Sequence, residues 1–395
     1  MVSVDYPFDT PAGADVDPEG LRLLEKGPLA RARMNGEHEV WLVLGYQAVR
    51  QVLSDPGFSR EAATRPGGPV TNPAGSNPEL LVSMDPPRHT GIRSLVAKAF
   101  SPRMVERLAS RVRELVNGLL DELAAQPRPA DLVRLLAEPL PIMVICELLG
   151  VPDADRARIR GWAGTLIAET AHTREEIAAA IGQVDAYLAE LIAARRETPD
   201  TALISALIAV NDEGRHLSPT ELISNVQLLL IAGHETTVSQ IGNSIVTLFG
   251  HPEQLKLLCR QPELLPGAVE ELLRHSKLTT STMPRVAVRD TMVGDTLVRA
   301  GEAVIPLIAV ANRDPAAFPE PHRVDITRTA PAPHLGLGYG PHYCLGAQLA
   351  RLELQVAIGA LLARFPALAP AVDLDDLEWK TGLSTRSLHA LPVTW

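Results

Sequence analysis

One cysteine of the chain lies in a glycine-rich loop that runs directly into a helix-forming segment. The stretch is Leu337-Gly338-Tyr339-Gly340-Pro341-His342-Tyr343-Cys344-Leu345-Gly346. Gly338 and Gly340 can adopt backbone angles closed to other residues, so the chain can fold tightly beneath a flat ligand. The residues after Gly346 favour a helix, whose N-terminal amides and dipole stabilise a thiolate. Cys344 is therefore a candidate thiolate ligand of a haem iron, a ligand that favours O–O bond cleavage.

For an arbitrary cysteine, a buried structural thiol is the ordinary alternative. The residues around Cys344, however, resemble the signature of the cytochrome P450 family, the haem-thiolate monooxygenases. That signature is an aromatic residue, Gly, x, Gly, x, His or Arg, x, Cys, x, Gly, and only Leu337 departs from it, in place of the usual Phe. The resemblance implies that Cys344 ligates the iron of haem b and that Gly338, His342 and Gly346 contact the cofactor.

A second chemical motif, Ala232-Gly233-His234-Glu235-Thr236-Thr237, lies within a long apolar segment. Gly233 in a helix interior costs about 1 kcal/mol relative to Ala, which predicts room for a ligand there. Thr236 can bond to the carbonyl of residue 232 or to an inserted water, and either loosens the helix locally. Glu235 and the Thr236 hydroxyl can then deliver protons to dioxygen. An exposed charge and an ordinary helical threonine are the alternatives.

The same motif matches the oxygen-activation motif of the P450 family. The resemblance implies that Glu235 and Thr236 are catalytic and that Ala232 and Gly233 contact the haem.

Haem carries two propionates, for which an acidic chain must supply local cations. His89 and Arg93 are four residues apart, on one face of a predicted helix. They match the propionate-binding pair of the family, and Arg285 and His342 match its other propionate contacts. Taken singly, each of these four residues could also be an ordinary surface or core residue.

Glu271 and Arg274 lie three apart on one predicted helix, where side chains face each other. In the family such a pair joins a downstream arginine in a buried network below the cysteine loop. Arg323 stands at the matching place here, so all three are predicted to be structural.

Composition limits the classes of protein. The 395 residues contain 46% hydrophobic and 21% charged residues, an ordinary globular balance. A formal charge of −10 disfavours nucleic acid and anionic membranes as partners. Three widely separated cysteines indicate neither a disulfide framework nor a zinc site. We recognise no basic segment followed by an apolar leader, and no apolar run long enough to span a membrane. We therefore expect a cytoplasmic monomer with one P450 domain over residues 1–395.

The local pattern predicts a mainly α fold with small β-sheets, the P450 fold. Helices are expected over residues 46–53, 87–100, 102–125, 131–149, 154–170, 174–196, 218–249 and 261–276, and short strands at 40–43 and within 283–305 and 376–395. The helix over 218–249 has the clearest start, because Ser218, Pro219 and Glu221 form a capping box with proline at its first position. Residues 60–81 read as a long loop, which in the family covers the substrate pocket.

The resemblance implies a monooxygenase that hydroxylates or epoxidises a bulky apolar molecule. The chain looks most like actinobacterial family members that modify polyketide macrolides or similar secondary metabolites. Terpenoid or steroid hydroxylation is the alternative substrate class, and peroxide-driven chemistry or a non-oxygenating haem protein the alternative activity. The pocket is predicted to be lined by Val82, Leu229, Ala232, Leu278, Thr282, Met283, Leu383 and Ser384.

The implied partners are O2, a ferredoxin and a ferredoxin reductase that draws electrons from NAD(P)H. An acidic ferredoxin needs a basic surface, and Arg88, Lys98, Arg103 and Arg351 can supply one. A normally solvated charged face is the alternative.

Overall fold

The computed structural model describes residues 4–8, 13, 15–69, 74–97, 100, 102–212, 217–279, 283–329 and 332–395, without the side chains of residues 102, 103, 210 and 212. The chain forms two compact units. Unit 1 comprises Met1–Thr71, Asn243–Cys344 and Asp373–Trp379, and unit 2 comprises Asn72–Gly242, Leu345–Val372 and Lys380–Trp395.

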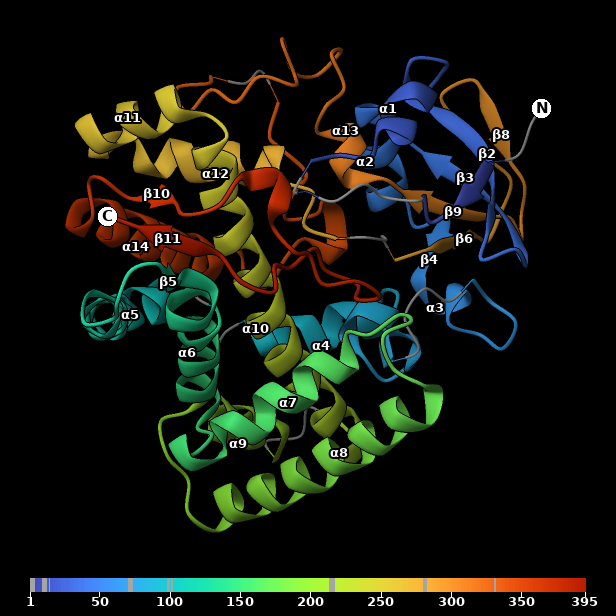
Figure 1. Cartoon of the computed structure of the whole chain (residues 1–395). Helices are drawn as coiled ribbons and strands as arrows, with labels where there is room; N and C mark the ends of the chain where they lie inside the picture. Colours follow the sequence, from blue (N-terminus) through green and yellow to red (C-terminus); the bar gives the residue numbers. More distant parts are fainter. Residues whose placement is uncertain are drawn as a thin grey trace. The chain divides into compact units, whose positions relative to one another are not determined.

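Unit 1 is built around a six-stranded sheet. Its strands, in spatial order, are β1 (Val4–Tyr6), β2 (Leu29–Met34), β3 (His38–Val43), β9 (Ala303–Pro306), β6 (Arg285–Ala287) and β4 (Phe58–Ser59). β1 pairs with β2 and β3 with β9 in parallel, and the other neighbours are antiparallel. The last four residues of β3 are buried, which explains its unbroken apolar run. The strand predicted at 40–43 is therefore confirmed as part of a larger sheet (Figure 1).

A separate hairpin in unit 1 joins β7 (Thr291–Val293) to β8 (Thr296–Val298). Gly294 has a φ of 56° in the connecting turn, a left-handed conformation that favours glycine. The predicted strand region 283–305 thus contains β6, this hairpin and β9.

Helices complete unit 1: α1 (Pro18–Leu24), α2 (Tyr46–Ser54), α3 (Arg60–Ala63), α11 (Pro252–Arg260), α12 (Leu265–His275) and α13 (Ile308–Ala311). The predicted loop over 60–81 was wrong at its start, because Ser59 caps α3 by accepting a hydrogen bond from the Ala62 amide at 2.8 Å. The helix predicted over 261–276 is two elements, a 3-10 turn at Pro262–Leu264 followed by α12.

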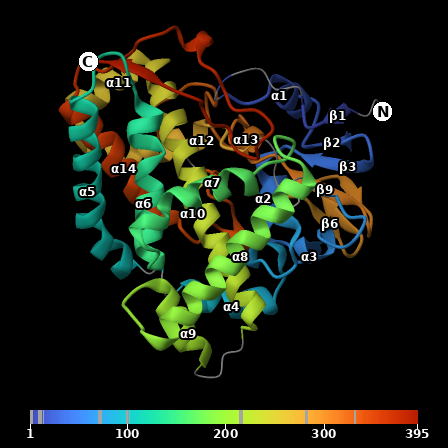
Figure 2. The same ribbon diagram turned by 60° about the horizontal axis from the view of Figure 1, so that its bottom comes forward.

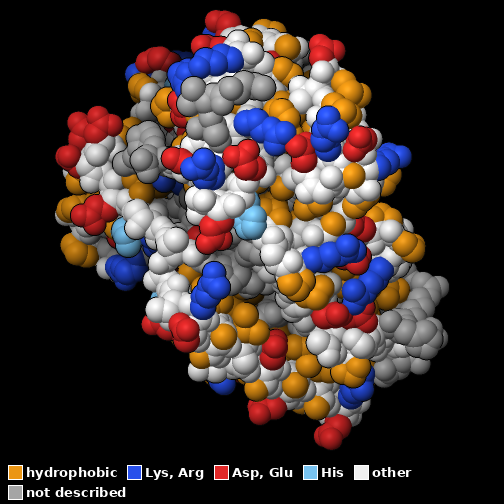
Figure 3. Space-filling model, turned by 90° about the vertical axis from the view of Figure 1, so that its right-hand side faces the viewer, with side chains coloured by type: hydrophobic (Ala, Val, Ile, Leu, Met, Phe, Trp, Pro, Cys, Tyr) orange, Lys and Arg blue, Asp and Glu red, His pale blue; other side chains and the backbone are white. Residues whose placement is uncertain are grey.

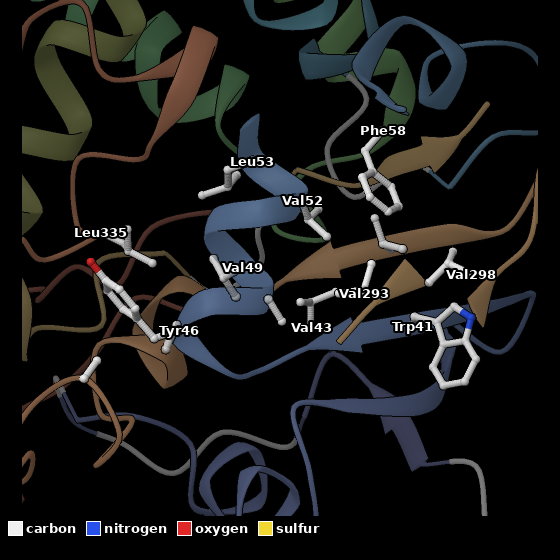
Figure 4. Packing of buried hydrophobic residues seen from close by; sticks show 14 of the residues in the cluster. Trp41, Val43, Tyr46, Val49, Val52, Leu53, Phe58, Val293, Val298 and Leu335 are labelled. Carbon is white, nitrogen blue, oxygen red and sulfur yellow. The ribbon is translucent and has the colours of Figure 1, made fainter. Parts of the chain in front are cut away.

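The core of unit 1 joins sheet, helix and cysteine loop. Figure 4 shows Tyr46 and Val49 of α2 packed between the strands and Leu335, a residue of the loop that leads to Cys344. Leu335 and Phe318 are fully buried in this cluster. The loop is therefore anchored by the same apolar burial that holds α2 against the sheet.

Unit 2 is mainly helical. Its elements are α4 (Arg88–Ala97), α5 (Pro102–Ala124), α6 (Pro139–Leu149), α7 (Arg156–Leu166), α8 (Arg174–Glu197), α9 (Leu203–Asp212), α10 (Pro219–Phe249, whose last turns belong to unit 1) and α14 (Ala347–Arg364), with a small sheet of β10 (Ala369–Pro370), β11 (Pro392–Thr394) and β5 (Ala130–Asp131). α5 packs against both α14 and α6 (Figure 2). The helix predicted over 131–149 is divided into a π turn at Val133–Ala137 and α6, with Pro139 as the first residue of α6.

Helix α10 is the longest helix described. Its 31 residues span about 46 Å at ~1.5 Å per residue. The predicted capping box is confirmed: the Glu221 amide donates to Ser218 Oγ at 3.1 Å, and the Ser218 amide donates to Glu221 Oε2 at 2.8 Å. α8 begins with a second capping box, formed by Thr173 and Glu176.

α8 is the one helix, among the described residues, that is long and apolar enough to meet a length and composition criterion for spanning a membrane. It carries Asp185 and Glu190 between its charged ends and packs against α7 and α9. On the face drawn in Figure 3, acidic and basic side chains are interspersed. Among the described residues on that face, the basic side chains form no continuous stripe of the kind used to bind phosphate backbones.

Candidate haem and oxygen-activation site

The loop that ends at Cys344 is shaped by its own backbone. The Cys344 amide donates to the Leu337 carbonyl at 2.8 Å, and the Gly338 amide donates to Leu335 at 2.7 Å. Gly338 and Gly340 have φ values of 77° and 71°. Both are in the left-handed region, so the glycines predicted to shape this loop are required by its conformation.

Helix α2 braces the same loop. A Cβ at Gly340 would lie 2.7 Å from the Leu53 carbonyl oxygen, so only glycine allows this approach. Arg50 stacks on the Tyr339 ring at 4.5 Å from its centroid and donates to the Tyr339 hydroxyl at 2.6 Å. The Tyr46 hydroxyl donates to the Pro333 carbonyl at 2.6 Å. The sequence analysis missed this brace, since nothing local indicates that α2 meets the loop.

A buried charge cluster lies behind the loop. Glu271 receives a bidentate pair of hydrogen bonds from Arg274 at 2.7 and 2.8 Å, and both side chains are almost wholly buried. Arg274 also donates to the carbonyl of Asn312, whose side-chain oxygen accepts the Leu335 amide at 2.8 Å. The cluster thereby fixes the start of the cysteine loop, as a structural role for Glu271 and Arg274 predicts.

The third side chain of this cluster is Arg328, and the assignment of Arg323 was wrong. Arg328 Nε lies 3.1 Å from both Glu271 oxygens, and its other nitrogens donate to three carbonyls between residues 319 and 323. The Arg323 guanidinium is exposed beside Glu320, and only the Arg323 carbonyl joins the cluster. The chain turns at Glu320, where φ is 47°, three residues before Arg323.

The middle of α10 carries the predicted oxygen-activation residues in unit 2. The Thr236 hydroxyl donates to the Ala232 carbonyl at 2.7 Å, one of the two arrangements expected for it. Ala232 is exposed in a helix whose neighbouring residues are mostly buried. At Gly233, by contrast, an added Cβ would lie 2.8 Å from Ile145 of α6. The room predicted for a ligand at Gly233 is therefore taken by Ile145, and the open side of the helix is at Ala232.

Glu235 is buried, with 7% of its surface exposed. Burial is the largest influence on its carboxyl group and raises the pKa, while Lys380 lowers it and Glu138 raises it further. His234 Nδ1 lies 3.5 Å from Glu235 Oε1, and burial lowers the pKa of His234 to about 4. Burial thus favours the protonated form of the Glu235 carboxyl group, and a buried carboxyl group of this kind is a candidate proton donor.

The predicted propionate contacts fall into two pairs. His89 and Arg93 both belong to α4 in unit 2, with His89 buried and Arg93 half-buried. Arg285, buried, begins β6 in unit 1, and His342 lies two residues before Cys344 in a 3-10 turn at Gly340–His342. Each unit thus supplies a histidine and an arginine.

The predicted pocket residues also divide between the units. Val82 belongs to a 3-10 turn at Leu81–Ser83, and Leu229 and Ala232 follow one another along α10. Leu383 pairs with Ala168, and the Ser384 amide donates to the Ile167 carbonyl at 2.9 Å. The segment 383–384 is therefore fixed beside the end of α7. Leu278 and Met283 lie in unit 1, and Thr282 lies outside the described residues.

Of the predicted basic docking residues, Arg88 is in ion pairs with Glu79 and Glu221. Its charge is therefore largely compensated. Arg351 is half-buried on α14, and the side chains of Lys98 and Arg103 lie outside the described residues.

Comparison with known proteins identifies the family. The cytochrome P450 family model matches residues 258–391. The chain is 45% identical to nocardicin C N-oxygenase of Nocardia uniformis subsp. tsuyamanensis, covering 99% of this chain and 98% of that protein. It is 43% identical to mycinamicin IV hydroxylase/epoxidase of Micromonospora griseorubida, over 99% and 98% of the two chains. The solved LnmA cytochrome P450 hydroxylase of the leinamycin pathway of Streptomyces atroolivaceus S-140 superposes with a TM-score of 0.92, at 46% identity over 99% and 100%.

These likenesses, with the cysteine loop and α10 motif, define a haem-thiolate oxidoreductase. The chain belongs to the cytochrome P450 family and is a monooxygenase whose cofactor is haem b. Bacterial members generally receive electrons from redox partner proteins.

The described residues fit a haem. Cys344 is half-buried, and a Cβ at Gly346 would meet no atom within 4 Å. On α10, the surface at Ala232 is open.

Proposed function

We propose that this P450 hydroxylates or epoxidises a bulky, largely apolar secondary metabolite, such as a polyketide macrolide. The observation that carries the proposal is the intact acid and alcohol pair on α10 of a chain with whole-length relatives named for secondary-metabolite oxidation. Electrons come from a ferredoxin and its NAD(P)H-dependent reductase in the cytoplasm, and the chain acts as a monomer with a single domain. The basic residues Lys98, Arg103 and Arg351 are the candidates for receiving the ferredoxin.

In this proposal Cys344 ligates the haem, and the histidine and arginine of each unit bind its propionates. The match of these residues to the family's motif positions supports this assignment. The bound haem supplies the activation of O2, and the thiolate favours O–O cleavage. The Glu271 cluster and the α2 brace hold the cysteine loop in one conformation.

Glu235 and Thr236 supply protons. Burial raises the pKa of Glu235, which favours the protonated carboxyl group that a proton donor needs. The Thr236 hydroxyl is bonded to the carbonyl of Ala232, four residues earlier on the same helix face, and can turn from that carbonyl to a water molecule. The pair can therefore pass a proton toward the open side of α10 at Ala232.

Mostly apolar pocket walls support a bulky apolar substrate with some oxygen atoms. Leu229, Leu278, Met283 and Leu383 are hydrophobic, whereas Ser384 offers a hydrogen-bonding group. The relative named as a mycinamicin IV hydroxylase/epoxidase supports C–H or C=C oxidation.

A screen of macrolides, terpenes, steroids and amine-bearing metabolites tests the proposal through the optical shift of the haem from low to high spin. We expect shifts with macrolide-type compounds and a product heavier by one oxygen atom in the presence of ferredoxin, reductase and O2. Optical shifts seen only with terpenes or steroids would mean that the substrate belongs to that class instead. Turnover with peroxide but none with reduced ferredoxin would overturn the electron source.

A further inference from the structure

Residues 77–83 are tied to the first turns of α10 by the side-chain amide of Asn225. Asn225 is 2% exposed. Its Oδ1 accepts the Leu81 amide at 2.9 Å, and its Nδ2 donates to the carbonyls of Glu79 at 3.0 Å and Glu221 at 2.8 Å. One buried amide therefore satisfies a backbone donor and a backbone acceptor of the segment while remaining bonded to its own helix. All these residues belong to unit 2.

Polar contacts on the surface reinforce this tie. Arg88 bridges Glu79 at 2.5 Å and Glu221 at 2.9 Å, and Asn77 Nδ2 donates to Ser224 Oγ at 3.3 Å. The Arg88 side chain is 43% exposed, so these ion pairs contribute little stability. The buried amide is the stronger restraint, because breaking it leaves backbone groups without partners away from water.

We propose that Asn225 is a positioning residue for substrate oxidation, acting through Val82. Val82 follows Leu81 in the 3-10 turn, and Ser83, fully buried, donates to the Gly75 carbonyl at 3.2 Å on its other side. Val82 is thus held between two anchored neighbours. The inference rests on the proposed function in one respect, that Val82 lines the substrate pocket. Loss of the Asn225 hydrogen bonds would shift Val82, the pocket wall, and change which part of the substrate is oxidised.

Two substitutions separate the parts of the clamp. Asn225→Leu keeps the approximate volume and removes all three hydrogen bonds. Asn225→Asp keeps the acceptor for the Leu81 amide but places a carboxylate beside the carbonyls of Glu79 and Glu221. Asn211→Leu is the matched control, because Asn211 Oδ1 also accepts a backbone amide, that of Leu217 at 2.6 Å, before the start of α10.

Hydrogen exchange of the Leu81 amide in the holoenzyme measures the clamp directly. We expect exchange about tenfold faster in Asn225→Leu, since one to two net hydrogen bonds stop holding the segment closed. Asn211→Leu should leave Leu81 exchange unchanged. Unchanged exchange in Asn225→Leu would overturn the proposal.

The functional arm uses a probe that is independent of substrate identity. Imidazole and a bulky aryl-imidazole both ligate haem iron through nitrogen, but only the bulky one needs the pocket wall. We expect the ratio of their dissociation constants to change at least about threefold in Asn225→Leu and to stay constant in Asn211→Leu, with an intact thiolate-type carbonyl spectrum in both. With a substrate identified in the screen, the ratio of oxidation products should change as well.

The outcomes are distinguishable. Faster Leu81 exchange with an unchanged imidazole ratio and an unchanged product ratio would overturn the positioning role. Failure of all macrolide-type compounds in the wild-type screen would defeat the proposed substrate class alone, because the exchange and imidazole measurements do not depend on it.

Discussion

The cysteine loop and the middle of α10 hold their functional residues by different means. The loop is fixed by contacts from α2, α12 and the segment 312–328, which are distant in sequence. The α10 residues lie on one continuous helix, and the Thr236 hydroxyl bonds within that helix. A ligand that must keep one geometry is anchored from several sides, whereas groups that must exchange protons are left with few partners.

The two regions also treat buried carboxylates differently. Glu271 lies within 3.1 Å of two guanidiniums. Glu235 has His234 at 3.5 Å, and burial raises its pKa. Paired charges serve structure in the first region, and a destabilised charge is available for chemistry in the second.

Removal of the thiolate from the cysteine loop should have the largest effect. Cys344→Ala should abolish turnover and the thiolate-type carbonyl spectrum of the reduced protein, because no other described residue of the loop offers a sulfur ligand. Cys259→Ala, at an exposed position on α11, is the control and should keep both. Retention of the spectrum in Cys344→Ala would refute the ligand assignment.

The anchoring of the loop is tested by two arginines. Arg328→Ala should lower the free energy of unfolding by about 3 kcal/mol or more, since it leaves buried Glu271 with one partner and removes donors from three carbonyls. Arg323→Ala should change it by less than about 0.5 kcal/mol, because its guanidinium is exposed. Urea unfolding of the holoenzyme measures both. Equal effects would contradict the corrected assignment.

The sparse partners of α10 predict sensitivity to acid. His234 is buried with its pKa lowered to about 4, so below its ordinary value of 6.5 the unfolded state binds the extra proton and the folded state does not. Stability is therefore lost as the pH falls from 6.5 toward 4. When the pH falls from 7 to 5, the free energy of unfolding of His234→Gln should decrease by about 2 kcal/mol less than that of the wild type.

The matched control is His389→Gln, at an exposed histidine. It should follow the wild type in urea unfolding at both pH values. An identical loss of stability in His234→Gln would remove His234 as the cause.

A small structural effect is expected at Thr236. Thr236→Ala should change the free energy of unfolding by less than about 1 kcal/mol, because it removes one hydrogen bond within a helix. It should nevertheless divert reductant to peroxide and lower the share recovered in product about tenfold. Simultaneous assay of NAD(P)H, peroxide and product measures this coupling. Unchanged coupling would count against proton delivery by the hydroxyl.

Local chemistry was legible in the sequence. The capping box of α10 and the glycine requirement of the cysteine loop depend on residues close together in the chain, so spacing predicts them. The boundaries of α10 were predicted for the same reason. The P450 class followed from two motifs that are each contiguous.

Contacts between distant segments were decided only by the tertiary structure. Arg328 takes the place predicted for Arg323, because the fold brings the Arg328 guanidinium beside Glu271 and leaves that of Arg323 exposed. Ile145 of α6 fills the space beside Gly233 of α10, although the two residues are far apart in the sequence. Asn225 gains its role from a segment more than a hundred residues earlier. Sequence spacing encodes the bonds that a helix or turn makes with itself, whereas the approach of two segments depends on how the whole unit buries its apolar surface.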